Sequence, residues 1–586
     1  MTGLRIVRRE PACSPRDWPA RVHPVLQRVY AARGVAYPEE LGHRLSGLLP
    51  PDGMHGIGRA AEMLGEVIAH DGRIVIAGDY DCDGATGCAV AVRGLRMLGA
   101  HRVGYAVPDR AVHGYGLTPE LVETIHPVPD LIVTVDNGIA AHAGVAAAKA
   151  RGSRVIVTDH HLPGERLPDA DAIVNPVLAR AACAQEGKGD EPSPHSSKDP
   201  ATACAPGNLA GVGVAFYLLL QLRARMGKRD TVDLAQLLDL VALGTVADLV
   251  PLDRNNRALV EGGLRRIREG MACAGVTALF EAAGRDPRTA VAADLGYAIG
   301  PRINAAGRLE DISLGIECLL ADDPARAREL AALLHDINAQ RQTLQSAMVE
   351  EAVAGLQHVE ARDVLGVSLF DPAWHQGVVG LVASKMKERL HRPVVAFAPA
   401  GEGDELRGSA RSVPGFHVRD ALAEVDARCP GLIDRFGGHA MAAGLTLKRS
   451  NYTRFAEVFD LVVRERIVPE SLQPVLHSDG ELMPADFDPE LARQLRWAGP
   501  WGQGFPPPLF DNVFECVGCD PLGADGAHRR LRLRDPRDGR MHDAVWFNAD
   551  DRMPLNAPLR IAYELTINDW QGRDSLRLLV RHLEPA

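Results

Sequence analysis

Between about residues 70 and 250 the chain alternates short apolar runs with longer stretches rich in Ala, Leu and Val. The runs are uninterrupted and rich in β-branched residues, which is typical of strands buried on both faces. The intervals between them are long enough for crossover helices. The pattern therefore predicts a doubly wound α/β domain with a parallel sheet. Its predicted strands lie at 73–78, 131–135, 154–158 and 171–176.

A long helix is predicted after this region. Asp323 can cap its N-terminus, Pro324 suits its first turn, and apolar residues repeat at helical spacing to about residue 356. Such a helix would be about 50 Å long at roughly 1.5 Å per residue, so we expect it to join two domains. The runs beyond it predict a second α/β domain, with strands at 364–370, 393–397, 408–413 and 443–447.

From about residue 472 apolar and polar positions alternate between turn residues, which predicts an all-β tail of the length of a small OB-like barrel. Residues 180–208 have no apolar period and are rich in Pro, Gly, Ser and charge, so we expect a mobile surface insertion without chemistry. The predicted organisation is an N-terminal helical segment (1–70), a first α/β domain (71–265), a helical connector (266–357), a second, smaller α/β domain (358–470) and the barrel (471–586).

Composition narrows the class of protein. A chain of 586 residues suggests three or four domains, and its net charge of −11 argues against a protein that coats nucleic acid. Local basic stretches at 384–392 and 528–540 are either phosphate-tracking grooves or ordinary solvated faces. The ten cysteines are scattered, and neither a signal peptide nor a membrane span is recognisable. We therefore expect a reduced, cytoplasmic protein.

Three of the predicted strands share a feature at their C-terminal ends. Each is followed by carboxylates or imidazoles: Asp79, Asp81 and Asp83 after the first, Asp136 after the second, and Asp159, His160 and His161 after the third. In an open parallel sheet the ligand site lies at the carboxyl ends of the strands. We therefore expect these side chains to converge on one crevice.

Several ionised carboxylates in one partly buried site repel each other strongly unless a cation compensates them. Oxygen-rich ligands with one or two imidazoles suit Mn²⁺ or Mg²⁺, and two such ions could activate a water for in-line phosphoryl displacement. An EF-hand loop is excluded because position 12 counted from Asp79 is Val90 and a strand precedes the loop. A surface turn rich in Asp would explain one motif but not three.

These motifs resemble a known superfamily. "DYDCDG", "VDNG", "TDHH" and "GTVADLVPL" resemble the four signature motifs of the DHH phosphoesterases, and "FGGHAMAAGLTL" resembles their DHHA1 domain. The motif order, "LAGVGVAF", "GPRINAAGRL" and the β-rich tail are similar to the superfamily's single-strand-specific 5′→3′ exonucleases, over about residues 70 to 580. The resemblance implies a metal-dependent hydrolase that releases nucleotides from single-stranded DNA in DNA repair and recombination. It further implies a single-strand-binding protein or a helicase as partner, and no membrane.

The resemblance also implies roles for individual residues. The implied metal ligands are Asp79, Asp81, Asp83, Asp136, His160 and Asp248. Asp79 is either a ligand or a group that orients one, since smaller members have a histidine two residues upstream, where this chain has Ala77. His161 is implied to contact phosphate or donate a proton, with Asp159 orienting the histidines and Asp136 also counted as catalytic.

A further set of residues is expected to bind the strand. Gly437, Gly438 and His439 resemble a phosphate-gripping segment, in which glycines let backbone N–H groups approach an anion. Tyr115 either stacks on a base or belongs to the core. The remaining candidates are Arg302, Asn304 and Arg308. Gln376, Ser409 and Arg411 are also candidates, but they can equally be ordinary surface residues.

Three other functions stay open. A hydrolase of short oligonucleotides or cyclic dinucleotides would need only the two α/β domains, so the β-rich tail argues against it. A non-catalytic DNA-binding replication scaffold would be expected to lose metal-site acids, which are all present here. A pyrophosphatase would make poor use of so long a chain.

Overall fold

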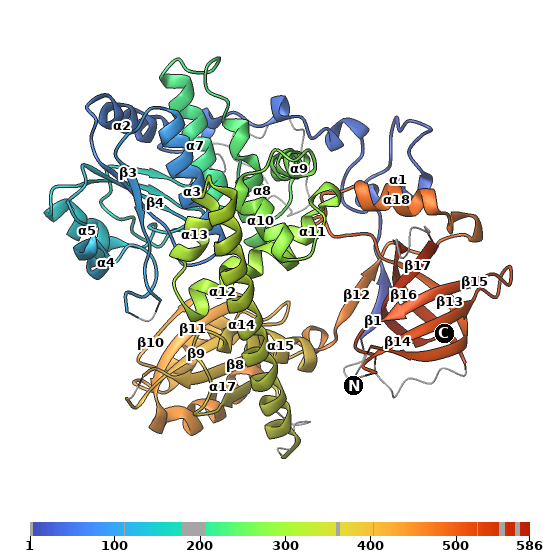
Figure 1. The fold of residues 1–586 in the computed structure, drawn as a ribbon. Helices are drawn as coiled ribbons and strands as arrows, with labels where there is room; N and C mark the ends of the chain where they lie inside the picture. The colour runs from blue at the N-terminus through green and yellow to red at the C-terminus, as the bar shows by residue number, and fades with distance from the viewer. Residues whose placement is uncertain are drawn as a thin grey trace, which may run out of the picture. The chain divides into compact units, whose positions relative to one another are not determined.

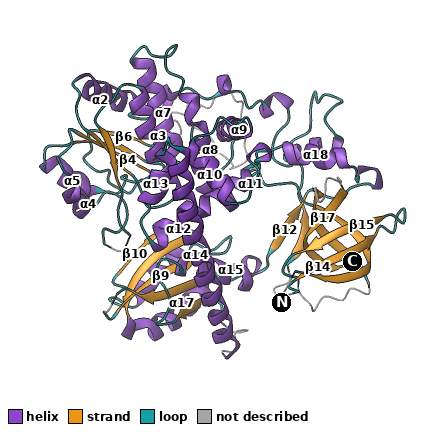
Figure 2. Ribbon diagram, in the orientation of Figure 1, coloured by secondary structure: helices purple, strands orange, loops and turns teal. Residues whose placement is uncertain are grey.

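The computed structural model describes residues 4–110, 112–178, 206–358, 364–401, 403–523, 526–549, 557–568 and 575–586. The predicted insertion at 180–208 lies outside the described residues except for its last three. The chain divides into two compact units, one formed by residues 1–7 and 339–477 and the other by 8–338 and 478–586. Figures 1 and 2 show the elements of both units.

The larger unit is built around a five-stranded sheet in which all strands are parallel and the order is β3-β2-β4-β5-β6. The four predicted runs are strands of this sheet. The prediction missed β3, an edge strand in which only Val103 is buried, so that its sequence lacks a continuous apolar run. The strands are β2 (Ile74–Ala77), β3 (Val103–Ala106), β4 (Leu131–Val135), β5 (Arg154–Thr158) and β6 (Ala172–Val174).

Helices cover both faces of this sheet. Ile74 and Ile76 of β2 face a core shared with α2, α3 and α7, whereas Val75 and Ala77 face a second core shared with α4 and α5. This arrangement confirms the predicted α/β class and explains why the strands are apolar throughout. The helices are α2 (Ile57–Ala69), α3 (Cys82–Met97), α4 (Pro119–Thr124), α5 (His142–Ala150) and α7 (Gly211–Arg225).

Further helices lead from this domain to the long helix α14 (Pro324–His358). Asp323 accepts hydrogen bonds from the backbone N–H groups of Ala325 and Arg326, so the predicted cap is confirmed. Residues of α14 belong to both units. The preceding elements are α8 (Leu238–Ala247), α9 (Arg254–Arg268), α10 (Ala274–Ala282), α11 (Ala292–Asp294), the π-helical turn η6 (Leu295–Ile299), α12 (Gly300–Leu309) and α13 (Ser313–Leu320).

The smaller unit contains a mixed sheet with the order β10-β11-β9-β8-β7, in which only β7 and β8 are parallel. The prediction missed β10, an exposed edge strand that ends in two glycines. The strands are β7 (Val367–Phe370), β8 (Val394–Pro399), β9 (Glu405–Arg411), β10 (Arg435–Gly438) and β11 (Ala442–Lys448). The helices are α15 (Val379–Leu390), α16 (Val418–Arg428) and α17 (Tyr452–Arg466).

The C-terminal strands close into a five-stranded barrel with the order β13-β14-β15-β17-β16, which confirms the predicted OB-like barrel. The expectation of an all-β tail was wrong, because Asp488 caps a short helix, α18 (Pro489–Trp497), with Pro489 in its first turn. The barrel strands are β13 (Phe510–Leu522), β14 (His528–Arg534), β15 (Met541–Trp546), β16 (Pro558–Asn568) and β17 (Ser575–Pro585). Two short strands, β1 (Arg5–Arg8) and β12 (Val475–Ser478), form a separate pair.

The N-terminal segment fastens the barrel to the rest of the larger unit. Tyr30 of α1 (Pro24–Ala31) stacks on Trp501 and Phe505, and Arg33 forms a buried ion pair with Asp479. The buried aromatic contacts and the paired buried charge together favour a rigid connection between the N-terminal segment and the barrel. None of the helices in the described ranges combines the length and the apolar character that crossing a bilayer requires.

Candidate metal centre

Acidic and imidazole side chains gather at the carboxyl ends of β2, β4 and β5. Three overlapping groups have ligand atoms within 4.8 Å of one another: Asp79 with Asp81 and Asp136, Asp83 with His160 and Asp248, and Asp136 with His160 and His161. The convergence follows from the parallel sheet, in which neighbouring strands end at the same edge. The structure thus brings together every residue that the sequence analysis named as a metal ligand.

The loop after β2 holds its aspartates by backbone hydrogen bonds. Asp81 is the N-cap of α3 and accepts a hydrogen bond of 3.0 Å from the N–H of Gly84. Asp83 accepts bonds of 2.6 Å and 2.9 Å from the N–H groups of Gly211 and Val212 at the start of α7. Two helix N-termini therefore hold these carboxylates in place.

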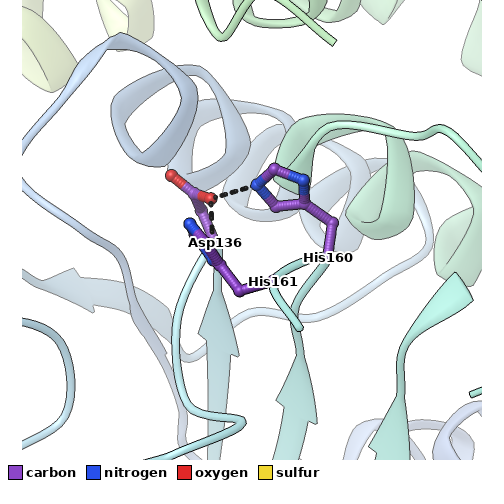
Figure 3. Close-up of side chains that lie close together, drawn as sticks. All are labelled: Asp136, His160 and His161. Atoms are coloured by element: carbon purple, nitrogen blue, oxygen red, sulfur yellow. Dashed lines mark hydrogen bonds and ion pairs between the residues drawn. The ribbon is translucent and has the colours of Figure 1, made fainter. Parts of the chain in front are cut away.

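Asp136 stands at the centre of the cluster. Its backbone has φ of 64°, a left-handed conformation that turns the chain sharply after β4. Its Oδ1 lies 3.0 Å from Nε2 of His160 and 3.9 Å from Nδ1 of His161. Figure 3 shows how the three side chains face one another. His160 Nε2 lies a further 3.5 Å from Asp248 Oδ2 and 3.9 Å from Asp83 Oδ2. One imidazole thus faces carboxylates from three different segments.

Asp248 enters the site from a helix, not from a strand. It is the C-cap of α8, which packs beside α3 and α7. The strand-end pattern could not indicate it, and only the resemblance of "GTVADLVPL" did.

Asp159 holds His161 in place. Its Oδ1 lies 2.8 Å from Nδ1 of His161 and accepts hydrogen bonds from the backbone N–H groups of His160 and His161, while Oδ2 accepts one from Ile139. Although burial alone would raise the pKa of Asp159, the hydrogen bond and charge of His161 lower it, and Asp159 in turn raises the pKa of His161 against the effect of burial. The pair therefore favours an ionised carboxylate beside a protonated, oriented ring.

The remaining carboxylates lack such compensation. Burial and neighbouring acids raise the pKa values of Asp79, Asp136 and Asp248 well above the usual range. Burial and Asp81 raise the pKa of Asp83 to about 7, against the effect of the two backbone N–H groups. Among the described residues, the buried atoms Asp79 Oδ1 and Asp248 Oδ2 have no hydrogen-bond partner.

Buried oxygens without a hydrogen-bond partner, together with raised pKa values, are typical of an acidic site that binds a cation. The donor set, carboxylate oxygens with one or two imidazoles, fits Mn²⁺ or Mg²⁺.

Glycines that the sequence analysis left without a role make this packing possible. A Cβ atom at Gly211 would lie 2.5 Å from Asp136 Cβ, and one at Gly84 would lie 2.6 Å from the carbonyl oxygen of Asp79. Neither position has room for a side chain, so α7 and α3 can approach the acids only through glycine. The small-residue segment "LAGVGVAF" was the available signal.

Comparisons with known proteins agree with this geometry. Family models match residues 73–245 (DHH family, N-terminal domain), 363–465 (DHHA1 domain) and 478–582 (RecJ OB domain). The chain is 44% identical over 594 residues to the single-stranded-DNA-specific exonuclease RecJ of Escherichia coli (strain K12), with 99% of each chain covered. It is 45% identical over 600 residues to the same protein of Salmonella typhimurium, with 100% of each covered. The chain belongs to the RecJ family.

Solved RecJ structures contain the expected metals. The Mn²⁺ complex of RecJ from Thermus thermophilus matches with a TM-score of 0.80 and 31% identity, covering 100% of this chain and 79% of that one. The Mg²⁺ complex from the same organism matches with a TM-score of 0.75 and 30% identity, covering 100% and 78%. These structures agree with the prediction of Mn²⁺ or Mg²⁺ as cofactor.

Tyr115 lies at the rim of the metal centre. Its hydroxyl donates a 3.1 Å hydrogen bond to the carbonyl oxygen of Asp136, and its ring meets those of His161 and Tyr80 edge-on. The residue is 50% exposed, which excludes the core position left open by the sequence. A π-face beside the acids is thus accessible to a base.

The three candidates on α12 have different surroundings. Asn304 Oδ1 accepts a 2.8 Å hydrogen bond from the N–H of Cys82 and so ties α12 to the loop that carries Asp81 and Asp83. Arg302 lies 3.1 Å from Nδ1 of His335, and Arg308 is half-buried on the same helix. α12 therefore lies beside the metal centre, with two guanidinium groups on it.

The candidates in the smaller unit cluster on one sheet. Gly437 pairs with Gly444, which pairs with Ser409, so these three positions share one row across β10, β11 and β9. Arg411 donates to the hydroxyl of Ser409 at 3.0 Å. Gln376 accepts a bond from Arg407 at 3.1 Å, Gly438 (φ 138°) ends β10, and His439 follows it in the turn to β11. Gly437 and Gly444 are exposed and carry no side chain, so an anion can approach the sheet closely at this row, near Arg411.

The basic stretch of the barrel is less available than its sequence suggests. Of the six arginines at 528–540, Arg530, Arg534, Arg537 and Arg540 form ion pairs with Asp543, Glu515, Asp535 and Asp538. Carboxylates from neighbouring strands and turns therefore balance most of this charge. The reading as an ordinary solvated face fits these four residues better than that of a phosphate groove.

Proposed function

We propose that this chain is a divalent-metal-dependent exonuclease that hydrolyses phosphodiester bonds of single-stranded DNA from the 5′ end, releases nucleotides, and acts in DNA repair and recombination. The observation that carries the proposal is the cluster of five aspartates and two histidines at the sheet edge, with two buried carboxylate oxygens lacking a hydrogen-bond partner among the described residues. The full-length likeness to RecJ proteins of that named specificity supports the substrate.

Asp79, Asp81, Asp83, Asp136, His160 and Asp248 would hold Mn²⁺ or Mg²⁺. The three overlapping ligand groups comprise seven side chains, more than one Mn²⁺ or Mg²⁺ ion would take, which favours two ions over one. Bound metal supplies Lewis-acid stabilisation of the phosphoryl group and makes water a better nucleophile.

His161 serves the leaving group. In the reaction a water oxygen bonds to phosphorus while the bond from phosphorus to the 3′ oxygen of the terminal nucleotide breaks, and that oxygen needs a proton. Asp159 fixes the ring of His161 through Nδ1 at 2.8 Å, which leaves Nε2 to contact the phosphate or deliver the proton. Asp136 Oδ1 lies 3.9 Å from the same Nδ1.

The strand would be held by contacts that do not depend on sequence. Arg302 and Arg308 on α12, and Arg411, Ser409, Gln376, Gly437, Gly438 and His439 in the DHHA1 domain, would bind phosphates. Asn304 would position the aspartate loop through Cys82. Tyr115 would stack on a base. We assign these roles to a catalytic domain (71–265), a connector (266–357), a substrate-binding domain (358–470) and the barrel (471–586), behind an N-terminal segment (1–70).

A nuclease confined to single strands depends on other proteins to expose them. We therefore propose a helicase or a single-strand-binding protein as partner, and a reducing cytoplasm as location. The eight cysteines within the described ranges are all free, which fits that compartment.

The test uses single-stranded DNA labelled at either end, and a matching duplex, with Mn²⁺, Mg²⁺ or a chelator. Wild-type protein should release labelled nucleotide first from the 5′ end of single strands only, and only with metal. Asp136→Ala should lose turnover while still binding the strand, because the phosphate contacts lie on other residues.

Each alternative gives a different result. Retained activity in Asp136→Ala would overturn the metal assignment. Bound but intact long strands, with cleavage of dinucleotides, would instead indicate an oligonucleotide or cyclic-dinucleotide phosphodiesterase. Survival of both substrates would leave a DNA-binding scaffold.

A further inference from the structure

Leu249, the residue after Asp248, has an unusual conformation and an unusual exposure. Its φ is 62°, in the left-handed region that leucine rarely adopts. It follows the C-cap of α8, and its N–H donates a 3.3 Å hydrogen bond to the carbonyl oxygen of Val246. Its side chain is nevertheless 66% exposed.

Helix termination alone does not account for a leucine here. The left-handed position just after a helix is normally taken by glycine, which has no Cβ to strain, or by asparagine. Apolar side chains near a helix end usually compensate by packing on the last turn, but that of Leu249 is turned mostly to solvent. The left-handed backbone at this position favours glycine or asparagine, and the protein interior gains little from the side chain of Leu249. The role of this side chain therefore lies outside the folding of the chain.

The residues next to Leu249 and in the metal cluster indicate what its side chain does. The preceding residue, Asp248, reaches to within 3.5 Å of His160 Nε2 at the centre of the metal cluster. Leu162, which directly follows His161, is 64% exposed in the same manner. Exposed leucines thus directly follow residues of the metal cluster in two separate segments, and a leucine can offer neither a charge nor a hydrogen bond to a phosphate.

From this we infer that Leu249 contacts a nucleobase of the bound strand, next to the phosphate that is cut. The inference rests on the proposed function and specifies how the strand is positioned. While the acids, through metal, engage the phosphate, an apolar side chain one residue away meets the uncharged face of an adjoining base. Every base has such a face, so the contact aligns the strand without selecting a sequence.

The experiment combines variants of Leu249 with strands that lack one base. Leu249→Gly removes the side chain and suits the left-handed backbone, so its melting temperature should equal or exceed that of the wild type. Its kcat/KM on ordinary single strands should fall roughly five- to tenfold, as expected for losing an apolar contact. Leu249→Met should restore most of that loss. Leu461→Ala, on the exposed face of α17, is the matched control and should change nothing.

Strands with a single abasic residue at each of the first few positions then locate the contact. At one position the wild type should lose the same factor as Leu249→Gly, and there the variant should add no further loss. An equal effect of Leu249→Gly on every abasic strand would overturn the inference, as would full activity of the variant. A clear fall in its melting temperature would also overturn it, by showing that the side chain packs within the protein. Failure of the wild type to degrade any single strand would instead refute the proposed function.

Discussion

Two regions of the larger unit differ in whether the protein itself compensates the charge of a buried aspartate. In the barrel, Asp511 is fully buried and accepts hydrogen bonds from Arg8, Arg560 and Ser478. These partners lower its pKa despite the effect of burial. In the metal centre, Asp136 is also buried, at 2% exposure, but burial and other acids raise its pKa well above the usual range.

The difference separates a structural carboxylate from a functional one. Arg8 reaches Asp511 across almost the whole length of the chain, which shows that this fold can bring a guanidinium to a buried acid. For Asp79, Asp83, Asp136 and Asp248 the largest cause of the raised pKa is burial, followed by a neighbouring aspartate. In the barrel, arginines of the protein neutralise the buried aspartate, whereas at the sheet edge a bound cation must neutralise the aspartates.

The largest expected effect comes from Asp136→Asn. Hydrolysis of single-stranded DNA should fall by at least about a thousandfold, because the central ligand is lost. Stability in chelator should stay the same or rise, since one uncompensated buried charge has been removed. Activity assays with Mn²⁺ and denaturant unfolding in chelator measure the two effects. A large loss of stability in chelator would mean that Asp136 is already compensated within the protein.

Asp511→Asn should behave in the opposite way. It takes a charged hydrogen-bond partner from Arg8 and Arg560, which are both partly exposed, and losing such bonds typically costs about 1.5–3 kcal/mol. Urea unfolding should show this loss, whereas activity well below the melting temperature should stay near that of the wild type. Asp286→Asn, in an exposed Asp–Arg pair, is the control and should leave stability nearly unchanged.

Mn²⁺ should stabilise the protein through the metal centre alone. At about 100 times the dissociation constant, binding to one site should add about 2.7 kcal/mol. The increment should be present in wild type and Asp511→Asn but absent in Asp136→Asn, as measured by urea unfolding with and without the metal. An equal increment in all three proteins would place the metal elsewhere.

The sequence correctly indicated the metal centre, but it gave a misleading picture of the charge on the barrel. Asp79 to Asp83, Asp136 and the histidines were predictable because each follows an apolar run, and strand ends in a parallel sheet converge. Asp248 follows a helix, and Gly211 acts through its N–H bond to Asp83 and its closeness to Asp136, so the strand-end pattern marks neither residue. The arginines of β14 formed a basic run in sequence, but their acidic partners lie across the barrel register.

The fold shows the same division. Buried strands such as β4, and the capped helix α14, were predictable because burial on both faces and capping leave local signals. The edge strands β3 and β10 and the short helix α18 were missed, because half-exposed or brief elements obtain their stability from neighbours instead of from their own sequence.

The smallest predicted effect concerns acid. Because the pKa of Asp511 is lowered in the folded barrel, its ion pairs stabilise the protein fully above the unfolded-state pKa of about 3.9, and this stability is lost as the pH falls through the lower folded value. The stability difference between wild type and Asp511→Asn should stay constant from about pH 8 to pH 5. It should then shrink as the pH falls below about 5, because the unfolded carboxylate takes up protons. Urea unfolding of both proteins in chelator at several pH values measures it, and a difference that grows on acidification would contradict the assignment of Asp511 as an internally neutralised carboxylate.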